Sequence, residues 1–399
     1  MRLLVVLSRV PYPLEKGDKL RAYHLVRRLA ARHEVYLFCV SDQHIAPEHL
    51  EHLRAFCAHI EVVHLPRWRI LLRLLGATFS RLPFQVAYFH HGHAQRALDR
   101  VIQRFRPDHV FCQLIRTTEY LRHRFELPKT LDLMDALSKG MERRTRNAGF
   151  LMRPWFRAET RRLIRYENLM LDLFDRSTII SAQDRDLLYH PLRDRVLVLP
   201  NGVDPAFAPR EAEKRYDLLF TGNMGYPPNI DSVRYLVHKV LPLVRKELPG
   251  ATLLVSGVDP APQVRELAAN DPLVTVSGWV KDMRSSYASA RVFAAPMQIG
   301  TGLQNKLLEA MAMGLPCVTS DLANNAVGAT DGRSILIGHA PEHYARHIVD
   351  LLKDEALRQR ISTEGAAFVR RTFDWDTSAD RLERTMLSVP PPAEVMKPV

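Results

Sequence analysis

A short stretch near residue 300 carries the residue types that bind a phosphate. Two glycines flank a threonine in Gly300-Thr301-Gly302, and Lys306 and Glu309 follow them. A glycine loop that opens onto a helix leaves backbone N–H groups free at the positive end of the helix dipole, where an anion is stabilised. Lys306, expected about one turn into that helix, adds a positive charge, and Glu309, one turn further, can accept two hydrogen bonds from the vicinal diol of a ribose. Together these residues predict a site for a nucleoside diphosphate.

The elements on both sides of this loop are typical of a parallel α/β domain. The apolar run 291–295 predicts a buried strand, and the residues after the loop repeat apolar positions at helical spacing. Gly314 predicts the end of that helix, and Cys317 begins the next strand. A purely structural interpretation stays open, because any strand-to-helix turn can contain glycines and Lys306 and Glu309 could form a surface pair.

The whole string that begins at Gly300 resembles the donor-site signature of family-4 glycosyltransferases, which have the GT-B fold. The resemblance implies that Glu309 holds the donor ribose and that Gly300, Thr301, Gly302 and Lys306 surround the diphosphate. Many members of that family carry a second Glu eight residues before Glu309, where this chain has Thr301. Contacts of that second Glu with the transferred sugar therefore do not carry over.

The same family pattern covers two further loops of the C-terminal half. The strand-like residues 216–221 lead into a loop with Gly222 and Asn223, which the resemblance assigns to donor binding. Many relatives place Arg and Lys next in this loop, whereas this chain does not, so Lys306 becomes the principal cation expected at the diphosphate. A later loop is expected to contact the nucleobase through the backbone near Val280.

The N-terminal half begins with the same succession of strand, glycine-bearing loop, helix and strand. Gly17 resembles part of the Gly-Gly loop by which this family reaches the donor diphosphate, but Asp18 replaces the second glycine and could instead cap the helix. Asp135 ends another predicted strand, where a side chain faces the crevice of a parallel sheet. It could orient a sugar hydroxyl, act as a base or cap the next helix. Asp132, within that strand, needs a partner if it is buried.

Composition narrows the class of protein. The 399 residues, 46% of them hydrophobic, suffice for two domains, and the net charge of +12 favours anionic partners. Four widely spaced cysteines argue against a zinc site or a redox pair and favour buried thiols in a reducing compartment. No apolar run reaches the roughly 20 residues that cross a bilayer. Residues 67–93 alternate arginines with apolar side chains, which is typical of a membrane-surface helix or of a helix packed on the sheet.

We therefore expect an α/β protein of the GT-B fold, with two Rossmann-like doubly wound domains and an interdomain cleft. The predicted domains are an acceptor domain (1–204), a nucleotide-sugar donor domain (205–376) and a C-terminal helix that crosses back to the first domain and ends in a loose tail (377–399). The resemblance implies a retaining, metal-independent glycosyltransferase without a cofactor. It would move a sugar from a UDP- or GDP-linked donor to a hydroxyl acceptor, with Asp135 and Lys306 as candidate catalytic residues.

Two strings in the first half, residues 11–24 and 131–144, resemble a bacterial subgroup of sugar transferases associated with exopolysaccharide and PEP-CTERM exosortase systems. This narrower resemblance implies exopolysaccharide or glycolipid assembly in the cytoplasm. A lipid-linked acceptor and peripheral binding to the acidic inner face of the plasma membrane stay open, and no nucleic-acid partner is expected. Two alternatives remain. A nucleotide-sugar epimerase of related fold would form product without an acceptor, and a non-enzymatic protein that binds anionic surfaces would not bind nucleoside diphosphates.

Overall fold

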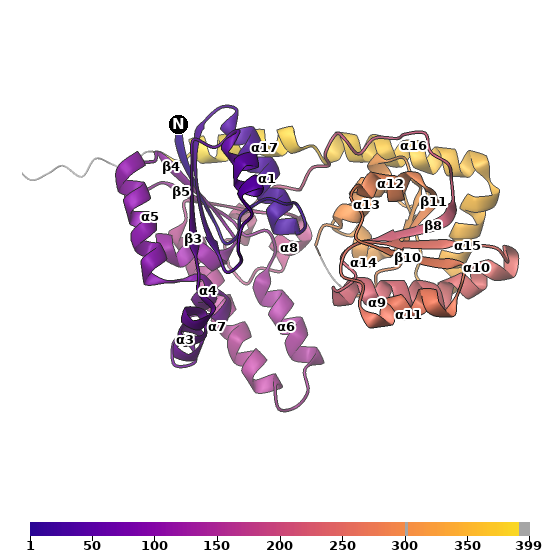
Figure 1. Cartoon of the computed structure of the whole chain (residues 1–399), viewed down its shortest axis with the longest axis horizontal. Coiled ribbons are helices and arrows are strands. Elements are labelled where there is room, and N and C mark those ends of the chain that lie inside the picture. Colours follow the sequence, from indigo (N-terminus) through magenta and orange to yellow (C-terminus); the bar gives the residue numbers. More distant parts are fainter. Residues whose placement is uncertain (300–301, 391–399) are drawn as a thin grey trace, which may run out of the picture. The chain divides into compact units, whose positions relative to one another are not determined.

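The computed structural model describes residues 1–299 and 302–390, which form two compact units (Figure 1). The first unit comprises Met1–Pro200 and the residues from Trp375 onward, and the second comprises Asn201–Asp374. Each unit is built on a parallel sheet with helices, which confirms the predicted fold class. The predicted loose tail lies largely outside the described residues. Among the helices that are described, none is long and apolar enough to span a membrane.

The sheet of the first unit has, in its described residues, seven strands in the order β3-β2-β1-β4-β5-β6-β7. The strands are β1 (Arg2–Leu7), β2 (Glu34–Ser41), β3 (His59–His64), β4 (His109–Gln113), β5 (Lys129–Asp132), β6 (Arg176–Ile179) and β7 (Leu197–Val198). All neighbouring strands are parallel, and β1 and β2 are buried almost throughout. The strand order reverses between β1 and β4, so the crevice that binds ligands in such sheets lies beyond the carboxyl ends of these two strands.

Helices surround this sheet and connect its strands. They are α1 (Gly17–Ala30), α2 (Pro47–Arg54), α3 (Arg67–Ala77), α4 (Phe84–Phe89), α5 (Gly92–Phe105), η1 (Ile115–Leu121), α6 (Leu137–Asn147), α7 (Arg153–Leu173), α8 (Ala182–Asp186), η2 (Arg193–Arg195) and α17 (Trp375–Leu387). Helix α17 is distant in sequence but packs against α1. The buried Trp375 ring stacks on His24 with 4.8 Å between ring centroids, and Arg28 Nε donates to Asp376 at 2.7 Å.

A buried ion pair joins α1 to the middle of this sheet. Arg21 Nε and Nη2 donate to the two carboxylate oxygens of Asp132 at 2.7 and 2.8 Å, and both side chains are fully buried. Thr178 Oγ1 donates to the same carboxylate at 2.8 Å, and Arg21 Nη1 donates to the carbonyl oxygen of Leu199 at 2.8 Å. The pair supplies the partner that Asp132 needs, and its polar atoms are well satisfied, as a buried charge pair requires.

The second unit has, among the residues described, six parallel strands in the order β10-β9-β8-β11-β12-β13. They are β8 (Tyr216–Thr221), β9 (Leu253–Ser256), β10 (Val274–Gly278), β11 (Ala290–Ala295), β12 (Cys317–Thr319) and β13 (Leu336–Ile337). Here the order reverses between β8 and β11. The loops that follow these two strands contain Gly222 and the predicted phosphate-binding stretch, so the topology brings both to one edge of the sheet.

The helices of the second unit are α9 (Pro227–Tyr235), η3 (Leu236–Val240), α10 (Leu241–Glu247), α11 (Pro262–Asn270), α12 (Met283–Ala288), α13 (Asn305–Ala312), α14 (Asp321–Asn324), α15 (Pro341–Lys353) and α16 (Glu355–Thr372). Helix α13 buries Leu307, Ala310 and Met311 against the sheet. It ends at Ala312, and the predicted stop Gly314 follows two residues later with a φ of 75°, which favours glycine. Its start differs from the prediction. The helix begins at Asn305, so Lys306 lies in the first turn rather than one turn further in.

Candidate active site

The loop after β8 brings the backbone at Gly222 directly against α13. Gly222 has a φ of 150°, and a Cβ there would lie 2.6 Å from Asn229 Nδ2 and 3.3 Å from Lys306 Nζ. A side chain would therefore take the space that these two polar groups occupy. The glycine gives a small ligand access to backbone and ammonium at one point, as glycine loops at phosphate sites do.

Lys306 is held in this corner by polar and aromatic contacts. Its ammonium donates to Asn229 Oδ1, lies 4.0 Å from Met297 Sδ and sits 4.6 Å from the centre of the Phe220 ring. The side chain is partly buried, and loss of hydration lowers the Lys306 pKa to about 7, although the nearby Glu309 carboxylate raises it. An anion bound beside this amine would favour the charged form, so the lysine is placed to bind a phosphate oxygen.

Glu309 lies one turn further along α13 and is oriented by a buried tyrosine. Tyr287 donates its phenolic hydrogen to Glu309 Oε2 at 2.8 Å, and the hydroxyl oxygens of Tyr287 and Thr221 are also 2.8 Å apart. Loss of hydration raises the Glu309 pKa to about 7, against the lowering effects of Tyr287 and then Lys306. One carboxylate oxygen is thus fixed by the protein. The other, Oε1, accepts no hydrogen bond from the residues described and is available to a ligand.

Three more of the predicted donor-binding residues, Gly302, Asn223 and Val280, lie in loops that follow strands of this sheet. Gly302 precedes α13 and has a φ of 84°, whereas Gly300 and Thr301 lie outside the described residues. Asn223 Oδ1 accepts a hydrogen bond at 2.8 Å from the backbone N–H two residues later, which closes the turn after β8. Val280 lies partly exposed in the loop between β10 and α12.

In the first unit, the predicted residues Gly17 and Asp18 open helix α1. A Cβ at Gly17 would meet no atom within 4 Å, so the fold itself does not require glycine there. Asp18 does not cap the helix, because the capping position is Lys16. The Asp18 carboxylate instead pairs with Arg9 and lies 3.8 Å from Arg116 Nη1. The capping interpretation of Asp18 was therefore wrong, and its charge is used in an ion pair at the edge of the sheet.

Asp135 follows β5 at the corresponding edge of the first sheet. It does not cap α6, whose capping position is Ala136; in the first turn of that helix the Ser138 N–H instead donates to Glu167 Oε1 at 2.9 Å. The Asp135 side chain is exposed at the surface, and the protein atoms around it remove part of its hydration. This desolvation raises the Asp135 pKa to about 6, Asp184 raises it further, and Arg116 lowers it. A carboxyl group that titrates close to neutral pH is suited to accept a proton from a hydroxyl.

Two contributors to this chemistry were missed in the sequence. Tyr287, which holds Glu309, lies in the short helix α12 and is fully buried, so it is indistinguishable in sequence from an ordinary core tyrosine. Asn229, which holds Lys306, lies 77 positions away from it in the chain. The sequence signal that could have identified Asn229 is its position just after a glycine loop and two prolines. The two residues keep the lysine and the carboxylate in fixed positions on one side of α13.

Comparison with known proteins finds a family match in the second unit. Residues 215–354 match the model of the family described as Glycosyl transferases group 1. The matched range contains Gly222, Lys306 and Glu309, and it ends one residue after α15. The second unit is therefore similar to that family over most of its length, and the two parallel-sheet units have the fold of GT-B glycosyltransferases.

Two relatives and one solved structure illustrate the likeness. An uncharacterized 44.6 kDa protein from the cps region of Klebsiella pneumoniae is 22% identical over 94% of this chain and 96% of that protein. A phosphatidyl-myo-inositol mannosyltransferase of Mycobacterium tuberculosis is 32% identical over 48% of this chain and 53% of the mannosyltransferase, about half of each. HepE from Anabaena, solved in complex with UDP and glucose, superposes with a TM-score of 0.67 at 13% identity, over 97% of this chain and 100% of that chain.

Proposed function

We propose that this protein is a retaining glycosyltransferase that moves a sugar from a nucleoside diphosphate sugar to a hydroxyl acceptor. The observation that carries the proposal is the pair Lys306 and Glu309 on α13. An ammonium for a diphosphate and a fixed carboxylate for a ribose lie one turn apart at the switch point of the second sheet. The family match over the same residues and the UDP bound by HepE support a UDP-linked donor, with a GDP-linked donor as the other candidate.

The proposed chemistry depends on a stabilised leaving group. As the bond between sugar and diphosphate breaks, negative charge grows on the diphosphate, and Lys306 together with the N-terminal N–H groups of α13 would stabilise it. This arrangement needs neither a fixed metal ion nor a cofactor. The role proposed for Asp135 is to orient the acceptor hydroxyl or to accept its proton. Gly17, Gly222, Asn223, Val280, Gly300, Thr301 and Gly302 are proposed to line the donor.

The proposed biological role is exopolysaccharide or glycolipid assembly at the inner face of the plasma membrane. Two observations support it. The Klebsiella relative, which matches over nearly its whole length, comes from a cps region. The name of the mannosyltransferase includes the phospholipid phosphatidyl-myo-inositol. A lipid-linked acceptor would be reached by a cytoplasmic protein bound peripherally to the acidic membrane surface, and the net charge of +12 favours such binding.

A thermal-shift screen followed by a transfer assay tests this function. A ligand that binds only the folded state raises the melting temperature, so UDP-, GDP- and ADP-sugars can be ranked directly. The preferred donor is then incubated with membrane lipids from a bacterium that makes exopolysaccharide, and transfer of labelled sugar into the lipid fraction is measured. Binding of no nucleotide sugar would contradict the proposal. Consumption of the donor to an isomeric nucleotide sugar without acceptor would instead indicate an epimerase.

A further inference from the structure

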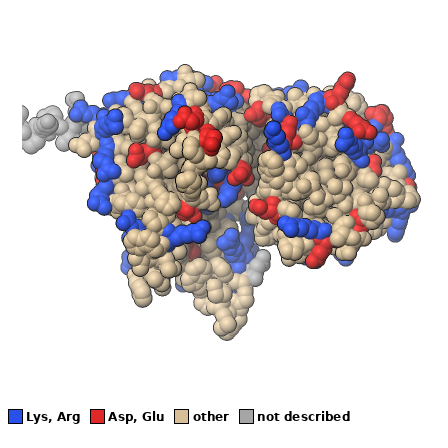
Figure 2. All heavy atoms as spheres, in the orientation of Figure 1, with Lys and Arg blue, Asp and Glu red and all other residues tan. Residues whose placement is uncertain are grey.

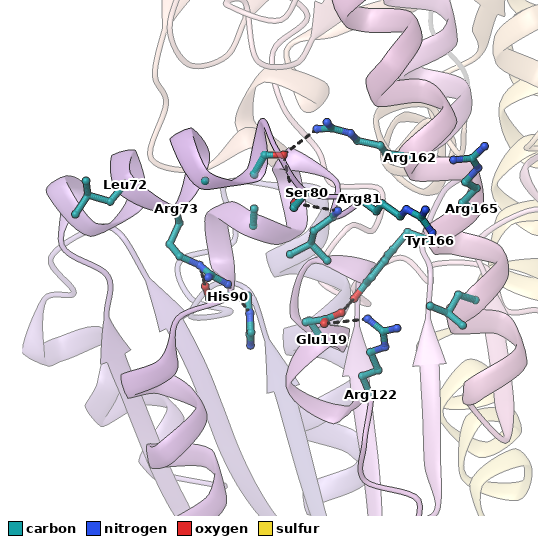
Figure 3. A pocket seen from close by; sticks show the side chains of 15 residues that line it. Leu72, Arg73, Ser80, Arg81, His90, Glu119, Arg122, Arg162, Arg165 and Tyr166 are labelled. Atoms are coloured by element: carbon teal, nitrogen blue, oxygen red, sulfur yellow. Dashed lines mark hydrogen bonds and ion pairs between the residues drawn. The ribbon is translucent and has the colours of Figure 1, made fainter.

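A cavity of about 960 Å³ opens in the first unit between α3, α4, η1 and α7 (Figure 3). Five arginines line it, and we call it the arginine pocket: Arg73, Arg81, Arg122, Arg162 and Arg165. Figure 3 shows Arg162 and Arg165 projecting from α7 and Arg73 from α3, with Arg81 between them. None of these residues belongs to the candidate active site, and the pocket lies within a single unit.

The lining of the pocket carries a strong excess of positive charge. Its one acidic side chain, Glu119, is already engaged, because Arg122 Nη1 donates to it at 3.3 Å and the Tyr166 hydroxyl at 2.9 Å. Just outside the lining, the buried Glu159 accepts a backbone hydrogen bond from Phe84 at 2.7 Å, and burial raises its pKa. Five guanidinium groups therefore face a single lining carboxylate that is already paired.

Several of these guanidinium groups make hydrogen bonds only to neutral groups, or make none among the described residues. Arg162 donates to the carbonyl oxygens of Ala77 and Thr78 at 3.1 Å each, which ties α7 to the end of α3. Arg73 donates to the carbonyl oxygen of His90 at 2.9 Å and contacts its imidazole. For Arg81 and Arg165, the described part of the chain provides no hydrogen bond or ion pair. Guanidinium groups that converge in this way are suited to bind a phosphate.

Two groups of exposed apolar side chains lie on or next to α3 and α7, two of the helices that line the arginine pocket. The first group lies on α3 and just after it, where Trp68, Leu71, Leu72 and Leu75 are each about 60% exposed and Phe79 is 94% exposed. Helix α3 buries only Ile70 and Ala77, so it is not simply packed on the sheet with its arginines in water. The sequence-based alternative of a helix packed on the sheet is therefore wrong for most of the apolar residues of α3.

The second apolar group lies in the turn before α7 and in its first residues. Phe150 and Leu151 are 90% and 88% exposed, and Met152 and Trp155 are also exposed. These two groups contain most of the large apolar side chains that are exposed in the described residues. Helix α3 and the α6–α7 hairpin project from the same side of the first unit (Figure 1), and that edge is largely free of charged atoms in the space-filling view (Figure 2).

We propose that the arginine pocket binds the phosphate head group of an anionic phospholipid while the two apolar groups enter the membrane interface. A soluble phosphate compound would be bound by the arginines alone and would leave the exposed Trp, Leu and Phe side chains of both groups without a partner. A bilayer surface offers a match for both features. Its phosphate head groups can bind the arginines, and the hydrocarbon just beneath them can take up the neighbouring apolar side chains. This inference rests on the peripheral membrane binding included in the proposed function, and it assigns that binding to a specific site.

The experiment compares two double variants that remove the same charge. Arg81→Gln/Arg165→Gln changes the pocket, whereas Arg370→Gln/Arg371→Gln changes exposed arginines near the end of α16 in the second unit. Sedimentation with vesicles of phosphatidylcholine, with and without phosphatidylglycerol, measures the affinity. One basic residue near an anionic surface accounts for about fivefold, so the pocket variant should bind about 30-fold more weakly and the control should bind like wild type. Affinity for UDP, bound in the other unit, checks that each variant is folded.

The possible outcomes separate this inference from the function on which it rests. Equal losses in both variants would show that only net charge matters, which overturns the pocket and leaves membrane binding intact. Wild type that stays in solution with acidic vesicles would overturn both, while donor binding and sugar transfer could still be found. If inorganic phosphate or glycerol phosphate raises the melting temperature of wild type but not of the pocket variant, and vesicles do not bind, the pocket takes a soluble phosphate and the lipid assignment fails.

Discussion

Replacing Glu309 by alanine should weaken binding of the donor nucleotide by an amount that the structure allows us to work out. Tyr287 fixes one carboxylate oxygen, which leaves Glu309 Oε1 to accept from the ribose diol. Hydrogen bonds to a charged group contribute about 1.5–3 kcal/mol. The dissociation constant of UDP should therefore rise about 10- to 150-fold in Glu309→Ala.

The same reasoning predicts how this loss depends on pH. Only the ionised carboxylate accepts both hydrogen bonds with full strength, and burial raises the Glu309 pKa to about 7. Wild type should therefore lose its advantage over Glu309→Ala as the pH falls below about 7. Isothermal titration with UDP or GDP over a pH series measures both effects in one experiment.

Tyr287→Phe is the matched control for this variant. It keeps the carboxylate but removes the hydrogen bond of 2.8 Å that orients it and stabilises its charge. We expect a smaller loss of affinity and a decline that begins at a higher pH, because the Glu309 pKa should rise further without the phenolic donor. An unchanged UDP affinity in folded Glu309→Ala, at a pH where the carboxylate is ionised, would refute the assignment of Glu309 to the ribose.

Changes at three further sites test the remaining interactions. Lys306→Ala should lower the affinity for UDP more than the affinity for uridine. Equal losses of affinity for the two ligands would exclude Lys306 as a phosphate ligand. In wild type, UDP affinity should fall as the pH rises above about 7, because burial lowers the Lys306 pKa to about 7 and the neutral amine no longer attracts the diphosphate. Lys306→Arg should abolish that decline. Gly257→Ala should lower the free energy of unfolding by about 1–3 kcal/mol, because its Cβ would lie 1.7 Å from the Gly222 carbonyl oxygen. If the variant is as stable as wild type in denaturant, the loop moves at no cost to make room for the methyl group. Arg21→Met should cost about 3–5 kcal/mol by leaving Asp132 buried and unpaired, whereas Arg21→Met/Asp132→Leu should recover most of it; a stable single variant would contradict the account of the buried pair.

The alternation of strand, glycine loop and helix was enough to predict the two sheets. Apolar runs such as 2–7 and 291–295 became buried strands, because in a parallel sheet helices cover both faces. Gly314 marked the end of α13 because few other residues adopt a positive φ. These are local rules, and they hold wherever the chain itself supplies the signal.

The contacts that complete the sites could not be predicted, because they join distant parts of the chain. Arg21 and Asp132 are 111 positions apart, and neither sequence neighbourhood identifies the other residue as its partner. The start of α13 was also missed, because the apolar spacing continues back to Leu303. Gln304 instead has a non-helical backbone, and its side chain donates to the carbonyl oxygen of Gly302 at 3.1 Å. The exposed apolar side chains of α3 have helical spacing, which shows that a helix forms but not which surface it faces.

The return of α17 to the first unit has a consequence for how the protein is made. Because the second unit is inserted between β7 and α17, the ribosome completes every strand of the first sheet before the helix that covers α1 exists. At about 5–20 residues per second, translation of the intervening unit takes on the order of 10–35 s. During that interval the surface that receives Trp375 stays open to water. The first unit to emerge is therefore the last to be finished, and a nascent chain halted before Trp375 would expose an apolar surface that chaperones recognise.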